Sequence, residues 1–145
     1  MYKRKVIDLE DALRLIEEVF RVGPRETDAP LAVSIVDENG DWVASARMDK
    51  TPPFNQAHAH RKAYTASIMR SDLRDFAASR AKSGRLLADL ADPSFIGSAH
   101  GGLVLRDDAG FVLGAIGVSG ATSDEDERIA RTAVAEAPLV FTEGN

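Results

Sequence analysis

A β-hairpin signal near the N-terminus constrains the fold of this chain more than any other feature of its sequence. Two runs rich in apolar residues, 31–36 and 42–46, flank the dipeptide Asn39-Gly40. Asn-Gly is a preferred sequence for a two-residue hairpin turn, because both residues tolerate the positive φ angles that such a turn requires. The segment therefore predicts a pair of antiparallel strands. A second hairpin is expected where residues 103–105 and 111–118 flank a turn at residues 107–110.

Helices are expected around the two hairpins. Asp8 is a residue of the N-cap type before apolar residues at helical spacing, and Gly23-Pro24 ends that run. Near the other end, a hydroxyl cap before the acidic residues 124–127 predicts a last helix that starts at Thr122 or Ser123. Between the hairpins we expect a helix capped by Asn55 that runs to about Met69, another from about Asp72 to Ser83 that ends at Gly84, and a loop over residues 86–98 that allows one helical turn.

The order of these elements is typical of an α+β domain. Helix, hairpin, two helices, hairpin and helix together predict an antiparallel sheet of about four to five strands with helices packed on it. With 145 residues, the chain can bury one core but is too short for a second independent one. We therefore expect residues 1–145 to form a single domain.

Composition excludes several classes of function. The formal net charge is -5, and no block of positive charge is long enough to follow a phosphate backbone, so a nucleic-acid partner is not expected. The sequence has no cysteine, which excludes disulfides, thiolate catalysis and iron–sulfur clusters. Acidic residues at positions 8, 10 and 11 interrupt any signal peptide, and no apolar run approaches the roughly 20 residues that span a bilayer. These features predict a cytoplasmic protein with no membrane partner.

A glycine-rich stretch at residues 114–120 leads from a strand into the last helix, as phosphate-binding loops do. Its spacing matches neither G-x-G-x-x-G nor G-x-x-x-x-G-K-[ST], and the acidic start of the helix would oppose a phosphate, so no nucleotide is expected. Residues 117–121 also approach the nucleophile pattern G-x-S-x-G but lack its last glycine. The favoured interpretation is a tight turn in which Gly117 and Gly120 allow close packing of the backbone.

The three histidines are candidate ligands of a metal ion or of haem iron. His58 and His60 lie near the start of the second helix, and His100 precedes Gly101-Gly102. Residues two apart on a helix point roughly 200° away from each other, so only one of the first two should face a given pocket. The other interpretation, that these histidines are merely exposed or hydrogen-bonded, stays open.

Lys62 shares a helical face with His58, one turn away. An ammonium group there could hold a carboxylate or a propionate, and the free N–H groups at a helix start attract anions. We therefore expect ligand binding at the N-terminal end of the second helix, facing the turn at residues 117–120. Lys62 could equally be solvated, and Arg47 could contact an anion or lie on the surface. Trp42 is expected to pack within its hairpin.

Four motifs together carry a resemblance to a known family. They are residues 32–37 with Asn39-Gly40, residues 46–49, residues 61–66, and residues 114–120 with the acidic residues 124–126. In this order they resemble the GlcG/HbpS family over roughly residues 7–137. The G-x-I-G-V-S-G run before an acidic helix start is the most specific of these motifs.

The resemblance implies a profilin-like fold that assembles into homo-oligomers, with members that bind haem and some that degrade it. By the family pattern, Lys62, the turn at residues 117–120 and Asp126 line the cleft. Two features depart from that pattern: the family usually has G-G-x-P-I where this chain has residues 101–105, and His58 with His60 is not part of the usual motif.

Two functions are therefore open. The first is a small-molecule binding protein, of the haem-binding or haem-degrading type, with a histidine as axial ligand. The second is a small catabolic enzyme, in which His58 exchanges protons or a histidine holds a metal ion, and Lys62 holds a substrate carboxylate. Haem and a metal ion are the cofactors that these readings allow. The candidate ligand-binding residues are His58, His60, Lys62, Arg47, Gly117, Ser119, Gly120 and Asp126, and the candidate metal ligands are His58, His60 and His100.

Overall fold

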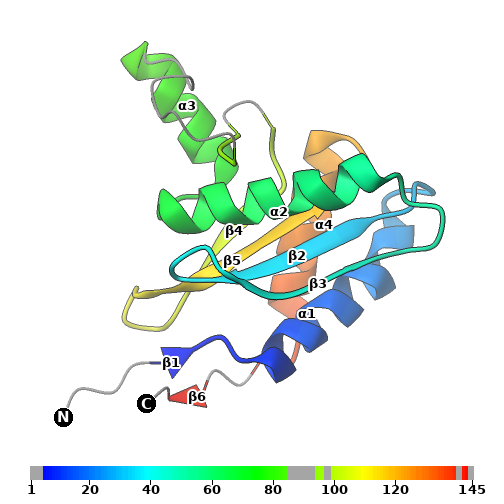
Figure 1. Ribbon diagram of the computed structural model, residues 1–145, viewed down its shortest axis with the longest axis horizontal. Coiled ribbons are helices and arrows are strands. Elements are labelled where there is room, and N and C mark those ends of the chain that lie inside the picture. The colour runs from blue at the N-terminus through cyan, green and yellow to red at the C-terminus, as the bar shows by residue number, and fades with distance from the viewer. Residues whose placement is uncertain (1–4, 85–93, 97–98, 140–141, 144–145) are drawn as a thin grey trace.

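The two predicted hairpins are joined into one antiparallel sheet in the computed structural model, which describes residues 5–84, 94–96, 99–139 and 142–143. Strand β2 (Ala32–Asp37) pairs with β3 (Trp42–Arg47), and β4 (Gly102–Arg106) pairs with β5 (Val112–Ser119). Strands β2 and β5 pair with each other at the centre, so the strand order is β3-β2-β5-β4 (Figure 1). The expected α+β architecture with an antiparallel sheet is confirmed.

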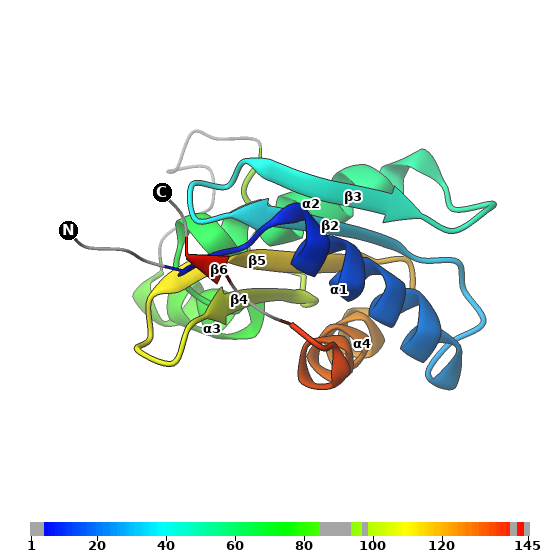
Figure 2. The same cartoon turned by 90° about the horizontal axis from the view of Figure 1, so that it is seen from below.

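Helices cover both faces of this sheet. Helix α2 (Pro53–Ile68) lies on one face, whereas α1 (Leu9–Val22) and α4 (Ser123–Glu136) lie together on the other (Figure 2). Helix α3 (Leu73–Ser83) follows α2 and projects away from the sheet (Figure 1). The main core lies on the α1 and α4 side, where branched side chains are buried, among them Leu15, Val19, Val33, Ile35, Ile116 and Ile129.

The α2 side is packed with small residues instead. Ala59, Ala63 and Ala66 are fully buried there. A Cβ atom on Gly117 would lie 2.1 Å from the carbonyl oxygen of Ala59, and one on Gly120 would lie 2.3 Å from that of Pro30. The backbone of β5 therefore approaches α2 closely, and the expectation that both glycines permit close backbone packing is confirmed.

The helix ends follow local capping rules. Asp8 accepts a hydrogen bond from the backbone N–H of Asp11, and Thr122 forms a capping box with Glu125 at the start of α4. The short 3₁₀ helix η1 (Gly23–Arg25) follows α1 where Gly23-Pro24 was expected to end it. Helix α3 ends at Gly84 in the left-handed conformation, also as expected.

Two expectations need correction. Helix α2 begins at Pro53 and not after Asn55, because proline is favoured in the first helical turn and Asn55 does not cap the helix. A second, two-stranded sheet pairs β1 (Lys5–Val6) with β6 (Thr142–Glu143) beside the main domain (Figure 1). These strands have two residues each, too few to show a periodic pattern. Most of the loop expected over residues 86–98 lies outside the described residues.

Within the described part of the chain, a helix that is both long and apolar enough to span a bilayer is not found.

Candidate functional site

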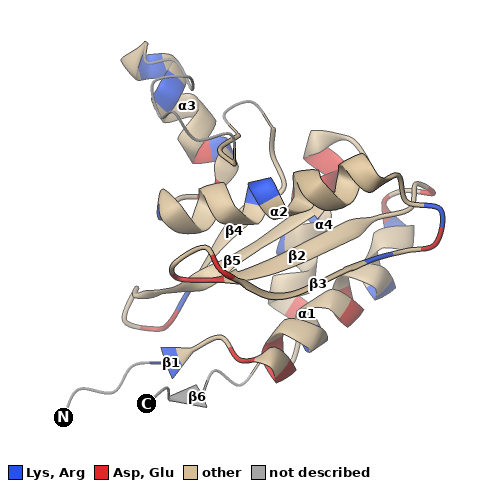
Figure 3. Ribbon diagram, viewed as in Figure 1, with Lys and Arg blue, Asp and Glu red and all other residues tan. Residues whose placement is uncertain are grey.

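Lys62 and Asp126 form an ion pair in the protein interior. The side chain of Lys62 reaches from α2 to the start of α4, where its Nζ donates to Asp126 Oδ2 at 2.9 Å and to the carbonyl oxygen of Val118 at 2.7 Å. Asp126 Oδ1 accepts the backbone N–H of Ala121 at 3.0 Å. The two residues are only 1% and 2% exposed. In Figure 3 the basic stretch of α2 and the acidic first turn of α4 lie near each other, in agreement with this pair.

Burial and pairing act in opposite directions on these two groups. Burial lowers the pKa of Lys62, and the nearby Asp126 carboxylate raises it. Burial raises the pKa of Asp126, and Lys62 lowers it. Both charges are thus satisfied inside the protein, and the pair ties α2 to the turn between β5 and α4. The family pattern places Lys62 and Asp126 in the cleft, whereas the structure places them in a buried contact between elements.

Residues 117–119, expected in a turn, are instead the end of strand β5, and this end packs directly against α2. Ser119 is buried, and its Oγ donates to Asn55 Oδ1 at 3.3 Å. Gly117 meets the backbone of Ala59, as described above. A ligand between the start of α2 and this end of β5, where the sequence predicts one, would have to displace these protein contacts.

The structure places the three histidines in separate surroundings. The ring of His58 stacks on Phe54 with 4.9 Å between centroids. His60 packs on Trp42 with 3.9 Å between centroids, and its Nδ1 lies 3.5 Å from Ser34 Oγ. His100 Nδ1 lies 3.3 Å from Asp124 Oδ1. Among the described residues there is no group of three or more His, Asp or Glu side chains that could hold a metal ion, so the expected metal ligands are not brought together there.

The surroundings of His58 and His60 favour the neutral imidazole, because they lower the pKa of both side chains. Burial lowers the pKa of His58, and the positive charges of Lys62 and Arg61 lower it further. Burial likewise lowers the pKa of His60, again with a contribution from Arg61. A neutral imidazole is the form that ligates a metal or haem iron.

Trp42 contacts β2, the partner strand of its hairpin, as expected, but most of its side chain is exposed. It is 64% exposed, and its Nε1 donates to Ser34 Oγ at 3.0 Å while its ring lies on His60. The cause is the strand order: β3 is an edge strand, and α2 lies over β2, β5 and β4. Tyr64 lies 6.2 Å from His60 and 5.6 Å from Phe95, between ring centroids. These four residues, Trp42, His60, Tyr64 and Phe95, form an aromatic row along α2.

Arg47 lies on the same face of β3 as Trp42. In the register with β2, Trp42 lies opposite Val36, Ser45 opposite Ser34, and Arg47 opposite Ala32. Opposite residues of an antiparallel pair point to the same face, and Ala32, Ser34 and Val36 alternate onto the face of β2 that α2 covers. The register shifts between Ile35 and Val36, so Trp42 faces the α2 side together with Ser45 and Arg47 although it lies three positions from Ser45. Arg47 is exposed there. The aromatic row and the arginine therefore share one surface, which the sequence did not identify.

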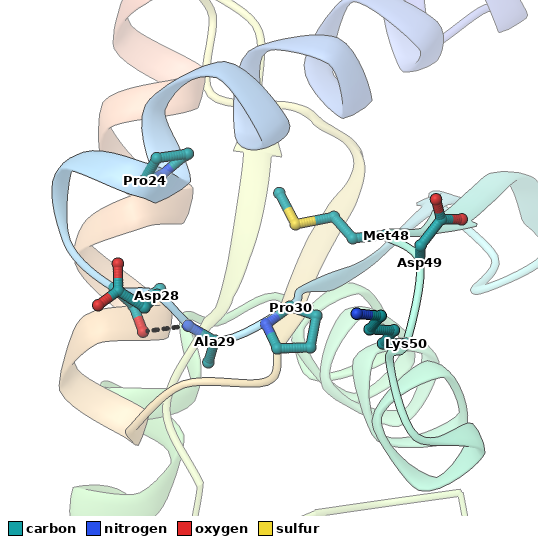
Figure 4. Close-up of a pocket in the computed structure, with 8 residues that line it drawn as sticks. Pro24, Asp28, Ala29, Pro30, Met48, Asp49 and Lys50 are labelled. Carbon is teal, nitrogen blue, oxygen red and sulfur yellow. Dashed lines mark hydrogen bonds between the residues drawn. The ribbon is translucent and has the colours of Figure 1, made fainter.

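A separate pocket of about 480 Å³ lies at the end of the sheet (Figure 4). It lies between the connection from η1 to β2 and the residues that follow β3. Pro30 and Met48 form part of its wall, and Asp28, Asp49 and Lys50 contribute charged side chains. No residue of the predicted site lines it, because it is formed by two loops that are adjacent only in the folded chain.

Sequence comparison places the chain in a family. It matches the model described as haem degrading protein HbpS-like over residues 7–135. It is 31% identical over 112 residues to the corrinoid adenosyltransferase PduO of Citrobacter freundii. The aligned region covers 76% of this chain and 33% of PduO. The chain thus spans about a third of the length of that relative. It is also 31% identical to an uncharacterized 15.0 kDa protein of the dhaT-dhaS intergenic region of the same organism, over 75% of this chain and 77% of that protein.

Three solved structures have the same fold over most of this chain. The PduOC:heme complex superposes with a TM-score of 0.80 at 24% identity, over 94% of this chain and 98% of PduOC. Protein ORFY of Klebsiella pneumoniae has a TM-score of 0.81 at 24% identity, over 93% and 92% of the two chains. A double mutant of Streptomyces reticuli HbpS has a TM-score of 0.79 at 26% identity, over 93% and 89%. The chain belongs to the HbpS-like family.

Proposed function

We propose that this protein binds haem. Membership of the HbpS-like family supports the proposal, and so does the structural similarity to PduOC, which was crystallised with haem. In this chain, the observation that carries the proposal is a neutral imidazole within an aromatic surface, formed by His60 and the rest of the aromatic row.

The residues of this surface fit the chemistry of haem. Haem iron binds imidazole, and the porphyrin ring packs on apolar and aromatic side chains. Trp42 offers an exposed indole ring, and Arg47 offers a cation for the propionates. Bound haem would supply an iron centre able to carry redox and oxygen chemistry, while the chain orients the group and shields part of it from water.

The enzyme alternative draws less support from the geometry. It requires Lys62 to hold a substrate carboxylate, yet the ammonium group already donates to Asp126 and Val118 and is almost fully buried. Binding a substrate there would break a buried ion pair, which is strongly unfavourable. We therefore favour haem binding over a reaction on a carboxylated metabolite.

Titration of the purified protein with haemin tests the proposal. We expect a Soret band that shifts and saturates at a fixed ratio of haemin to protein, and a parallel loss of Trp42 fluorescence. An unrelated protein of similar size serves as the control for adsorption of haemin to apolar surfaces. Absorbance that rises with haemin as in this control, without saturation, would contradict haem binding. Incubating the saturated sample with a reductant in the presence of dissolved O2 then reports haem degradation as a loss of the Soret band, and the same incubation without O2 is the control.

We also propose that the protein assembles into homo-oligomers. Leu9 and Leu13 are 55% and 47% exposed and lie one turn apart on α1, so they form an apolar strip. Burial of such a strip against a second copy would be favourable.

A further inference from the structure

His60 differs from the other two histidines in how firmly its ring is oriented. The indole of Trp42 lies against one face of the imidazole, and Ser34 Oγ lies 3.5 Å from Nδ1. Ser34 is completely buried on the central strand β2 and also accepts the indole N–H of Trp42 at 3.0 Å. The imidazole ring is therefore positioned by Trp42 and Ser34, whose side chains are hydrogen-bonded to each other.

This arrangement directs the second ring nitrogen away from the sheet. Nδ1 and Nε2 lie on different sides of the imidazole, so a ring whose Nδ1 faces Ser34 turns Nε2 away from β2. Among the described residues, none forms a hydrogen bond with Nε2. A hydroxyl oxygen has two lone pairs, so Ser34 Oγ can accept from both Trp42 Nε1 and His60 Nδ1. With its proton on Nδ1, the neutral imidazole presents a lone pair on Nε2, as histidines that ligate metals do.

The other two histidines lack this combination. His100 faces Asp124, which also accepts from Arg74, so its surroundings are charged and not aromatic. His58 stacks on one aromatic ring, Phe54, whereas His60 contacts both Trp42 and Tyr64 within the aromatic row.

We propose that His60 Nε2 is the axial ligand of haem iron, with the porphyrin lying along the aromatic row beside Trp42. The inference rests on the proposed haem binding and assigns its site. Arg47 completes the site at the propionate edge, because it lies two residues beyond Ser45, about 7 Å along the strand. Its guanidinium can pair with a carboxylate in bidentate geometry. The site thus lies on the exposed side of α2 and leaves the buried pair of Lys62 and Asp126 intact.

The test compares His60→Ala with His58→Ala and His100→Ala as matched controls. Each variant is titrated with haemin and followed by the Soret band and by quenching of Trp42, the single tryptophan of the chain. We expect His60→Ala to bind haemin at least about tenfold more weakly and to lose the spectrum of a histidine-ligated iron. Added imidazole should restore that spectrum. The two controls should bind within about twofold of the wild type and keep its spectrum, since neither removes the iron ligand.

The possible results distinguish failure of the proposed haem binding from failure of the assignment to His60. If wild-type protein gives no saturable spectrum with haemin, the proposed function fails and the site assignment fails with it. If wild-type protein binds haemin but His60→Ala keeps the wild-type spectrum, or if a control variant loses it, the assignment to His60 is overturned and haem binding stands. Thermal melting of the haem-free variants checks folding. Should His60→Ala be unfolded, His60→Gln keeps most of the side-chain volume and is judged by the same spectrum.

Discussion

Removal of one partner from the buried ion pair should destabilise the protein strongly. In Lys62→Met, the carboxylate of Asp126 stays buried and keeps only the N–H of Ala121 as a described partner, while the carbonyl of Val118 loses the lysine as a donor. Loss of one member of a buried pair typically costs about 3–5 kcal/mol, because the remaining charge is uncompensated. For a domain of this size the melting temperature should fall by roughly 10–20 °C.

A double-mutant cycle isolates the interaction. Asp126→Asn should also be destabilising, because it leaves a buried ammonium group with no carboxylate. The combined variant, Lys62→Met with Asp126→Asn, buries no charge and keeps an amide oxygen for the N–H of Ala121. Its loss of stability should therefore be smaller than the sum of the single losses by about 1–3 kcal/mol.

The loss of folding stability in Lys62→Met should also depend on pH. Burial raises the pKa of Asp126 and Lys62 opposes this effect, so removal of Lys62 raises the pKa further. A carboxyl group with a raised folded-state pKa contributes stability that is present below its unfolded-state pKa and is lost as pH rises through the folded-state value. The difference in stability between the wild type and Lys62→Met should therefore shrink as the pH falls from about 7 toward about 4.5.

Urea unfolding followed by circular dichroism measures these quantities at each pH. Single losses that add to within about 0.5 kcal/mol in the combined variant would show that the two groups do not interact. A deficit of Lys62→Met that stays constant on acidification would show that Asp126 is not a buried, uncompensated carboxylate in that variant.

Three further predictions concern packing, ligand charge and assembly. Gly117→Val should lower the melting temperature by more than about 5 °C, because its Cβ meets the backbone of Ala59; a variant within about 2 °C of the wild type would refute this close approach. Arg47→Gln should weaken haemin binding several-fold in absorbance titrations but leave haemin dimethyl ester unaffected, and an equal effect on both ligands would argue against a propionate contact. Light scattering should report a mass that is a multiple of 15.6 kDa, and Leu9→Lys with Leu13→Lys should reduce it; a wild-type particle of 15.6 kDa would exclude self-association under those conditions.

Much of the fold could be predicted because its signals are local. The turn at Asn39-Gly40, the cap at Asp8 and the capping box from Thr122 to Glu125 each depend on residues within a few positions of one another. The close packing of Gly117 was also predictable, although the residue lies within β5 and not in the turn after it, since a glycine there suggests that the backbone itself is in contact. Ordered motifs along the chain were sufficient to predict the family.

The candidate site depended on contacts that no local pattern encodes. Lys62 has the same neighbours in the sequence whether it is solvated or buried, and its partner Asp126 is 64 positions away. Trp42 is exposed only because β3 is an edge strand, and the strand order follows from how the two hairpins pair through β2 and β5. That pairing also places Ser34 beneath His60. Local propensities act over one or two turns of backbone, whereas these contacts form only when the whole sheet assembles, so tertiary structure alone decided which histidine packs against Trp42 and Ser34.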